Sequence, residues 1–350
     1  MKKILWLTNL PAPYRIPIWS QIGKSFDLRV VFLLGEINWR NWSLNGKFTF
    51  NYDFLNLRCL KIGELELIPG IKLKNLKIAS YNCIVFGSWE NPMYLFSMFF
   101  AKCFKIKTVC IYESTIMSNK HKGVFVSLIK KVFFNNADCI ISFGPKSTES
   151  LVNLGISTQN VLELYNPVPP FLDYSREESD NGHRFLFVGQ LIARKNIFEI
   201  IKGFQEIRNT GDTLTIVGDG DLRLEIDDYI HSRNLSKHVI MMGHLDSPEL
   251  TKIYRRSDTL VLASRTEVWG LVVNEALSQG MHVVVTNNCG VAPFIQSMKG
   301  VFIVNNNGDS LSAGMGESRR TWKGGIVQPE IENFSTLQFA DSFMAALNDL

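Results

Sequence analysis

The sequence predicts an α/β protein built from two doubly wound parallel sheets, each in a domain of its own. Short apolar runs alternate with longer amphipathic stretches from end to end, which is typical of βαβ units. The chain has 350 residues, more than a single hydrophobic core usually supports, and this favours two domains. The alternation breaks once, at 166–183, where prolines precede an acidic, polar run and indicate a linker.

Eleven short apolar runs are the predicted strands. Those of the first half are 4–7, 28–33, 83–86, 108–112 and 139–142, and those of the second are 185–188, 213–217, 239–242, 259–263, 282–286 and 300–304. Between them, apolar residues three and four apart predict helices, whereas the polar stretch 305–323 predicts an exposed loop. We expect domains at 1–170 and 184–330, a linker at 171–183, and a helix within 331–350 that packs back toward the first domain.

The charge of the chain is unevenly distributed. Residues 1–170 carry 20 Lys and Arg against 10 Asp and Glu, whereas residues 171–350 carry 17 against 23. The positive first half suggests an anionic partner, such as a phosphorylated acceptor or an acidic membrane surface. A solvated lysine surface is an equally good explanation, so both remain open. We expect no nucleic-acid partner.

The cysteines and the apolar segments indicate a cytoplasmic protein. Six cysteines without a C-x-x-C pair are typical of small buried residues in a reducing compartment. The first apolar run ends at Asn9 and Pro11, which favours a strand over a signal peptide. Lysines interrupt the apolar window 92–112, so no transmembrane helix is predicted.

The stretch 120–134 is both basic and apolar, and it has two interpretations. It could lie on an anionic membrane, at the inner face of the plasma membrane. It could instead be a helix that packs on the first sheet with lysines at its rim, and its place between two strands favours this second interpretation.

Two carboxylates flank an apolar run at 266–280. Glu267 falls in the loop after the strand 259–263, and Glu275 falls inside the helix that follows. Gly270 allows a ligand to approach the backbone closely. The amides of Trp269, Gly270 and Leu271 open that helix and form a natural seat for phosphate.

A second strand, glycine turn and helix start occupies 187–196. Arg194 and Lys195 follow the turn at Gly189, and Asn196 is predicted to cap the helix that begins at Ile197. Both cations are expected at the carboxyl end of the sheet, where open α/β sheets bind ligands. A diphosphate between them and the Gly270 amides would be held from both sides.

These motifs resemble those of glycosyltransferase family 4 (group 1), the retaining nucleotide-sugar transferases of GT-B fold. The resemblance depends on G-x-L-x-x-x-K ending at Lys195, on the turns 218–223 and 242–244, and on E-x-W-G-x-x-x-x-E-A beginning at Glu267. It covers the second half of the chain in order, and the first half more loosely. It implies two Rossmann-like domains that face each other across a cleft.

The resemblance also implies roles for individual residues. Lys195 would contact the donor diphosphate, Glu275 the ribose hydroxyls, and Glu267 the hydroxyls of the donor sugar. At position 190, where the family usually has arginine, this chain has Gln190. Either Arg194 supplies the missing charge, which we favour, or the diphosphate is held less tightly. The turn 289–294 also departs from the family pattern. The remaining predicted donor-binding residues are Gly189, Trp269, Gly270, Leu271, Gly243 and His244. The transfer chemistry that the resemblance implies requires no metal, so neither a metal nor a cofactor other than the nucleotide sugar is expected.

The first domain is expected to bind the acceptor. Arg15, Trp89, Glu90 and Glu113 follow predicted strands, and Glu113 is the candidate for orienting or deprotonating an acceptor hydroxyl. The expected activity is sugar transfer to a saccharide or lipid-linked acceptor, in cell-surface polysaccharide or glycolipid biosynthesis. Two alternatives are a non-catalytic nucleotide-sugar-binding protein and a nucleotide-sugar epimerase of the same fold.

Overall fold

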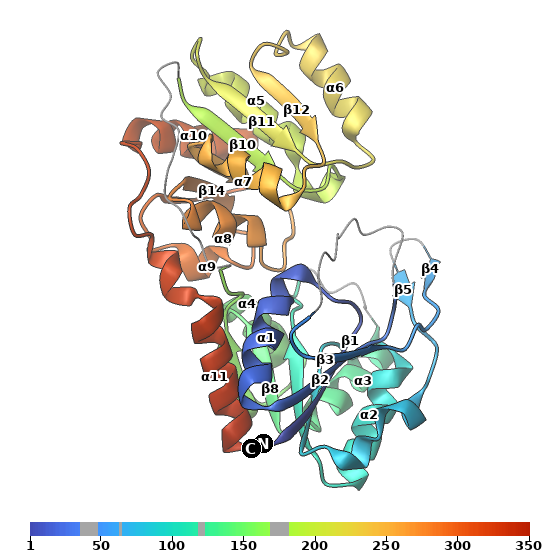
Figure 1. Ribbon diagram of the computed structural model, residues 1–350. Coiled ribbons are helices and arrows are strands. Elements are labelled where there is room, and N and C mark those ends of the chain that lie inside the picture. Colours follow the sequence, from blue (N-terminus) through green and yellow to red (C-terminus); the bar gives the residue numbers. More distant parts are fainter. Residues whose placement is uncertain (36–47, 63–64, 118–122, 169–181) are drawn as a thin grey trace. The chain divides into compact units, whose positions relative to one another are not determined.

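The computed structural model describes residues 1–35, 48–62, 65–117, 123–168 and 182–350. They form two compact units, Met1–Tyr165 with Thr336–Leu350, and Asn166–Ser335. Each unit is built on one parallel sheet with helices on both faces (Figure 1), which confirms the predicted fold class. Most of the expected linker at 171–183 lies outside the described residues.

The first unit contains a seven-stranded sheet in the order β3-β2-β1-β6-β7-β8-β9, with all neighbours parallel. Its strands are β1 (Lys3–Thr8), β2 (Asp27–Phe32), β3 (Asn51–Phe54), β6 (Cys83–Phe86), β7 (Lys107–Tyr112), β8 (Cys139–Phe143) and β9 (Val161–Leu164). A separate antiparallel hairpin pairs β4 (Leu60–Ile62) with β5 (Leu65–Leu67).

Helices cover both faces of this first sheet. On one face α1 (Ile16–Ser25) contacts the terminal helix α11 (Thr336–Asp349), and Trp6 stacks on Phe343 of α11 at 5.0 Å between ring centroids. Right-handed crossovers place α2 (Pro92–Cys103), α3 (Val124–Asn135) and α4 (Pro145–Asn153) on the other face. The short helices of this unit are η1 (Pro13–Arg15), η2 (Leu73–Leu76), η3 (Ile78–Ser80) and η4 (Thr158–Asn160).

The second unit contains a six-stranded parallel sheet in the order β12-β11-β10-β13-β14-β15. Its strands are β10 (Arg184–Val188), β11 (Thr213–Val217), β12 (Val239–Gly243), β13 (Thr259–Leu262), β14 (His282–Thr286) and β15 (Val301–Val304). Its helices are η5 (Ala193–Lys195), α5 (Ile197–Ile207), α6 (Arg223–Ser232), α7 (Ser247–Arg255), α8 (Leu271–Ser278), α9 (Ala292–Ile295), α10 (Gly308–Thr321) and η6 (Glu330–Phe334). The order in which the chain adds strands reverses next to β10: β11 and β12 lie on one side of it, and β13, β14 and β15 lie on the other. Doubly wound sheets bind ligands at this switch point.

All eleven predicted strands are present, but the predicted loop at 305–323 is wrong. Most of it forms α10, which packs against α5. The helix approaches its neighbours closely because small residues lie at the contacts. A Cβ on Gly314 would be 2.6 Å from Cγ1 of Val304, and a Cβ on Gly203 of α5 would be 3.1 Å from the amide nitrogen of Ser312. Asn307 caps α10 by accepting a hydrogen bond from the Ser310 amide.

Candidate functional site

The predicted site residues of the second unit gather at the switch point of its sheet. Lys195 lies in η5, just after β10, and Glu267 lies in the loop after β13. These two strands are hydrogen-bonded neighbours, with Phe185 opposite Thr259. Parallel pairing therefore brings the two loops to the same edge of the sheet.

Lys195, Arg194 and Glu267 form one ion cluster. The Nζ atom of Lys195 donates to Oε2 of Glu267 at 2.5 Å, and Nη1 of Arg194 donates to the same oxygen at 2.9 Å. Arg194 also donates to the carbonyl of Thr266 at 2.8 Å, and Ser264 donates its hydroxyl to Glu267 at 3.2 Å. Two cations thus share one carboxylate, which leaves the cluster with a net positive charge.

Burial and charge act in opposite directions on Glu267. Burial alone would raise the pKa of its carboxyl, but Lys195 and Arg194 outweigh it and hold this pKa below the usual range. The side chains of Lys195 and Glu267 are only 11% and 14% exposed, whereas that of Arg194 is 40% exposed. Glu267 is consequently a stable anion that holds both cations in place, and Arg194 is the cation more open to solvent.

Asn196 supports this cluster. It occupies the N-cap position of α5, but its side chain does not cap the helix, contrary to the prediction from the sequence. Its backbone is left-handed, with φ 59°, and its side chain makes no capping hydrogen bond. Instead Oδ1 accepts from Nε of Arg265 at 3.1 Å, and Nδ2 donates to the carbonyl of Asn306 at 3.0 Å. The Arg265 amide donates to the carbonyl of Arg194 at 2.9 Å. These bonds tie η5 to the loop that carries Glu267.

Glycines allow two loops to interlock beside the cluster. The Gly189 amide donates to the carbonyl of Val217, and the Leu191 amide donates to that of Asp219. A Cβ on Gly218 would lie 1.9 Å from the carbonyl oxygen of Gly189, so no side chain fits there. The turn at 218–220 therefore supports the η5 loop through its backbone.

The start of α8 lies beside Glu267. Gly270, its N-cap residue, has φ 102°, and a Cβ there would come within 2.9 Å of Cδ2 of Leu262 and 3.7 Å of Cγ of Glu267. Among the described residues, none accepts a hydrogen bond from the Trp269, Gly270 or Leu271 amides. The Trp269 ring is buried and donates Nε1–H to Oδ1 of Asn274. The three amides are thus donors without a partner in the described chain, whereas the tryptophan ring is part of the core.

The unusual turn at 289–294 holds this loop through its backbone. The Gly290 amide donates to the carbonyl of Glu267 at 2.9 Å, and the Val291 amide donates to that of Trp269 at 3.1 Å. A Cβ on Gly290 would be 1.7 Å from the carbonyl oxygen of Val268. Gly290 is thus required for this contact.

Glu275 lies one turn into α8, with a partner that the sequence analysis missed. Tyr254 of α7 donates its hydroxyl to Oε2 of Glu275 at 2.7 Å. Burial raises the pKa of Glu275, and the Tyr254 hydrogen bond only partly opposes this rise. The two residues are 21 positions apart on different helices, so no spacing rule could have paired them. Arg265 and Ser264 were missed for a similar reason, since neither belongs to a motif.

Three predicted donor-binding residues stand apart from the ion cluster. Gln190 is exposed. Gly243 is the last residue of β12 and His244 follows it, and β12 lies two strands away from β10. In the described part of the chain, no hydrogen bond or ion pair joins the His244 side chain to Lys195 or Glu267. Gln190, Gly243 and His244 share with the ion cluster only their position at the carboxyl edge of the sheet.

The predicted acceptor-side residues lie in the first unit. Arg15 is buried and forms an ion pair with Glu113. Burial would lower the pKa of Arg15, but Glu113 and Tyr14 more than offset this and raise it. Trp89 is buried, with the ammonium of Lys130 4.9 Å above its ring, and Glu90 accepts a hydrogen bond from the Ser88 hydroxyl. Of these four predicted residues, Arg15 and Glu113 are therefore the two that an ion pair joins directly.

Neither a metal site nor a membrane-spanning helix is found in the part of the chain that the structure describes. No group of three His, Cys, Asp or Glu side chains could hold a metal ion there. Among the described helices, none has the length and apolarity needed to cross a bilayer.

Comparisons with known proteins connect this geometry to one family. Residues 173–317 match the family of glycosyl transferases group 1. A glycogen synthase of Mycobacterium tuberculosis is 34% identical over 262 residues, which cover 70% of this chain and 62% of that protein. An uncharacterized glycosyltransferase of Methanocaldococcus jannaschii is 28% identical over 174 residues, 45% of each. The chain thus matches about half to three-fifths of the length of these relatives.

Solved structures share the fold of the whole chain. The crystal structure of Anabaena HepE in complex with UDP-glucose superposes with a TM-score of 0.74 and 14% identity, and the match covers 100% of each chain. At this identity the likeness concerns the fold alone.

Proposed function

We propose that the chain, whose residues 173–317 match the glycosyl transferases group 1 family, transfers a hexose from a nucleotide-diphosphate sugar to a saccharide or lipid-linked acceptor. The observation that supports this most is the Lys195–Arg194–Glu267 cluster beside the open amides of α8. It combines two positioned cations with fixed backbone donors, which suits a diphosphate.

In the proposed reaction, the bond between the anomeric carbon of the sugar and the phosphate oxygen breaks, and its electrons leave with the nucleoside diphosphate. An acceptor oxygen attacks the same face of the sugar, which retains the anomeric configuration, and gives up its proton. Negative charge grows on the leaving phosphate during this step. Lys195 and Arg194 would therefore stabilise the transition state more than the bound substrate.

The two glutamates have separate roles in this proposal. Glu267, next to the Gly270 backbone, would accept hydrogen bonds from hydroxyls of the donor sugar while it fixes the two cations. Glu275 would accept from the ribose hydroxyls, with Tyr254 holding one of its oxygens. Gly189, Gln190, Gly243 and His244 would line the donor side at the same edge of the sheet.

The acceptor would bind to the first unit. Arg15 follows β1 and Glu90 follows β6, and the chain reverses direction across that sheet between these two strands. Glu113, held by Arg15, is the candidate for orienting or deprotonating the acceptor hydroxyl. The relatives include a lipopolysaccharide 1,6-galactosyltransferase of Salmonella typhimurium and a glycogen synthase, which supports a saccharide or lipid-linked acceptor in cell-surface polysaccharide or glycolipid biosynthesis.

A panel of UDP-, GDP- and ADP-sugars tests this function, with released nucleoside diphosphate and the fate of the sugar as readouts. We expect one donor to release its nucleoside diphosphate, slowly to water and faster once a suitable acceptor is added. Binding without turnover of any donor would favour a non-catalytic protein. Conversion of the donor sugar without nucleotide release would favour an epimerase.

A further inference from the structure

Helix α2 in the first unit has two apolar faces. Its inner face packs on the sheet with Met93, Tyr94 and Met98. Its outer face presents Phe96 and Phe99, and the exposed Phe104 follows directly after the helix; Phe99 is 62% exposed. A helix on the surface of a globular protein normally has polar residues on its outer side, so this aromatic stripe calls for another explanation.

The next helix in the chain, α3, repeats the pattern. Phe133 and Phe134 point into the core, whereas Val124, Phe125, Leu128 and Val132 are exposed, with Phe125 75% exposed. Val124, Leu128 and Val132 are four residues apart and form one stripe. Both helices cover the same face of the sheet, since each connects the next strands in order (Figure 1). Together they form what we call the α2–α3 face.

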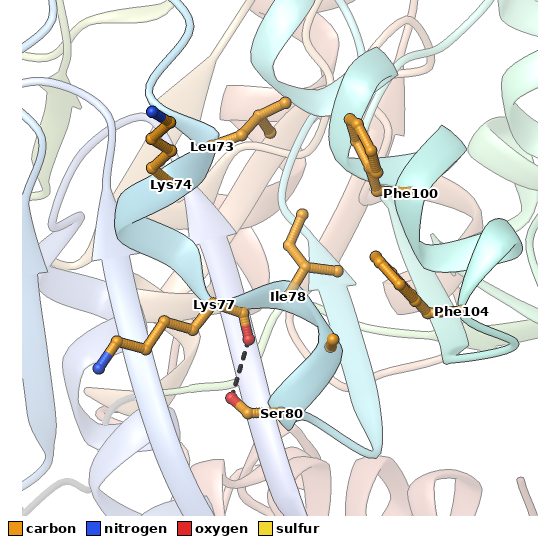
Figure 2. A pocket seen from close by; sticks show the side chains of 8 residues that line it. Leu73, Lys74, Lys77, Ile78, Ser80, Phe100 and Phe104 are labelled. Atoms are coloured by element: carbon orange, nitrogen blue, oxygen red, sulfur yellow. Dashed lines mark hydrogen bonds between the residues drawn. The ribbon is translucent and has the colours of Figure 1, made fainter.

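A pocket of about 550 Å³ adjoins this face at the end of α2. Phe100 and Phe104 form one side, and Leu73 and Ile78 pack opposite them. Figure 2 shows the Lys74 and Lys77 ammonium groups at the outer rim, away from the phenylalanine rings. The pocket therefore has an apolar interior and a cationic edge.

The charge around the α2–α3 face is predominantly positive. Residues 68–110 contain six lysines and one acidic residue, Glu90, and residues 123–138 contain two lysines, of which Lys130 is buried, and one acidic residue, Asp138. Within the described chain, Lys74, Lys77 and Lys105 form no salt bridge, whereas Lys102 pairs with Asp138. Interfaces with other proteins are usually depleted in lysine, so the combination of lysines with exposed aromatic rings favours an anionic lipid surface.

We infer that the α2–α3 face docks on a membrane of anionic phospholipid, with its apolar side chains among the lipid head groups and acyl chains and its lysines on lipid phosphates. The pocket would seat one such lipid, its apolar part against Phe100 and Phe104 and its phosphate at Lys74 and Lys77. The inference deepens the proposed function, because a protein docked in this way would work where a lipid-linked acceptor resides.

Cys103 provides a direct reporter. It lies at the end of α2 and is exposed, contrary to the expectation that the cysteines are buried; Cys59 and Cys139 are half-buried. In a C59S/C139S background, an environment-sensitive fluorophore on Cys103 should shift to the blue with vesicles of phosphatidylglycerol and phosphatidylcholine, and not with phosphatidylcholine alone. Co-sedimentation with the same vesicles should show at least about tenfold tighter binding to the anionic ones at low salt, and salt should weaken it.

Two double variants test whether vesicles bind to the α2–α3 face specifically or adhere to the protein nonspecifically. Phe99→Ser with Phe125→Ser should weaken vesicle binding at least about tenfold, and Lys74→Glu with Lys77→Glu should weaken it and flatten its salt dependence. The matched controls in the second unit, Leu224→Ser and Lys252→Glu, should leave binding unchanged; Leu224 is 78% exposed.

The inference is overturned if anionic vesicles do not bind at low salt, or if the controls lower binding as much as the test variants. It is also overturned if the chain dimerises in sedimentation experiments and Phe99→Ser with Phe125→Ser abolishes the dimer, because the face would then be covered by a second copy. Donor hydrolysis in solution should be the same in all variants. Its absence from the wild type would count against the proposed function and not against the membrane surface.

Discussion

At the residue scale, the candidate donor site depends on two cations sharing a single carboxylate. Lys195 and Arg194 both donate to Oε2 of Glu267, so one positive charge is not neutralised within the cluster. Since Lys195 and Glu267 are largely buried, this charge is screened by water less than a surface charge would be. A diphosphate can complete the charge balance, whereas a neutral ligand cannot.

Another buried residue of the second unit, His183, links stability to pH. Its Nε2 atom is 2.7 Å from the Thr259 hydroxyl, and burial lowers its pKa to about 4, although Asp258 and Asp212 oppose the shift. The unfolded chain takes up this proton near pH 6.5 and the folded chain only near pH 4. Between these values the unfolded state binds more protons, so stability falls as the pH is lowered.

We predict that the free energy of unfolding of the second unit declines by up to about 3 kcal/mol between pH 6.5 and pH 4, at about 1.4 kcal/mol per pKa unit. Denaturant titrations across this range measure it. His183→Gln should flatten the decline, and His231→Gln, on the exposed side of α6, should leave the slope as it is. An unchanged slope in His183→Gln would show that other groups dominate.

At the scale of elements, the helices α8 and α10 show which features could be predicted from the sequence. The glycine, the flanking glutamates and the apolar run of 266–280 are local signals, and α8 begins where they indicate. Helix α10 has the sequence GDSLSAGMGESRRT, with few apolar residues and three glycines, which lower intrinsic helix propensity. It forms because small residues permit close packing on α5 and the sheet, and such a contact leaves no periodic signal.

A pair of substitutions in α10 tests this packing. Gly314→Ala places a Cβ 2.6 Å from Cγ1 of Val304, so it should destabilise the second unit by about 1 to 3 kcal/mol. In Gly316→Ala the nearest atom to the new Cβ is 3.9 Å away, so the better helix propensity of alanine should stabilise by up to about 1 kcal/mol. Thermal or denaturant unfolding measures both, and effects of the same sign would contradict the packing argument.

The two edge strands of the first sheet were missed for a related reason. β3 is exposed along its whole length, and β9 has four residues of which only Leu164 is buried. Both lie at the edges of the first sheet. A strand that buries little apolar surface lacks the hydrophobic run by which the eleven other strands could be recognised.

At the scale of the whole molecule, the two units share one sheet topology, and each places its own candidate site where the order of strands reverses. In each sheet the chain starts near the middle, winds to one edge and then crosses to fill the other. Loops that are far apart in the sequence therefore meet at one point, as those carrying Lys195 and Glu267 do. The motifs identified these residues, but the ion cluster between them, and the support from Arg265, Asn196 and Tyr254, depend on tertiary contacts that no local pattern specifies.

The most direct test of the donor site compares the binding of nucleoside diphosphates and nucleosides to the wild type and to Lys195→Ala. Lys202→Ala, an exposed lysine on α5 paired with Glu199, is the matched control. We predict that Lys195→Ala weakens binding of the preferred diphosphate, and lowers turnover of its sugar donor, at least about tenfold, which corresponds to roughly 1.4 kcal/mol. Nucleoside affinity and the control should stay the same. Wild-type diphosphate affinity and turnover in Lys195→Ala would contradict the account.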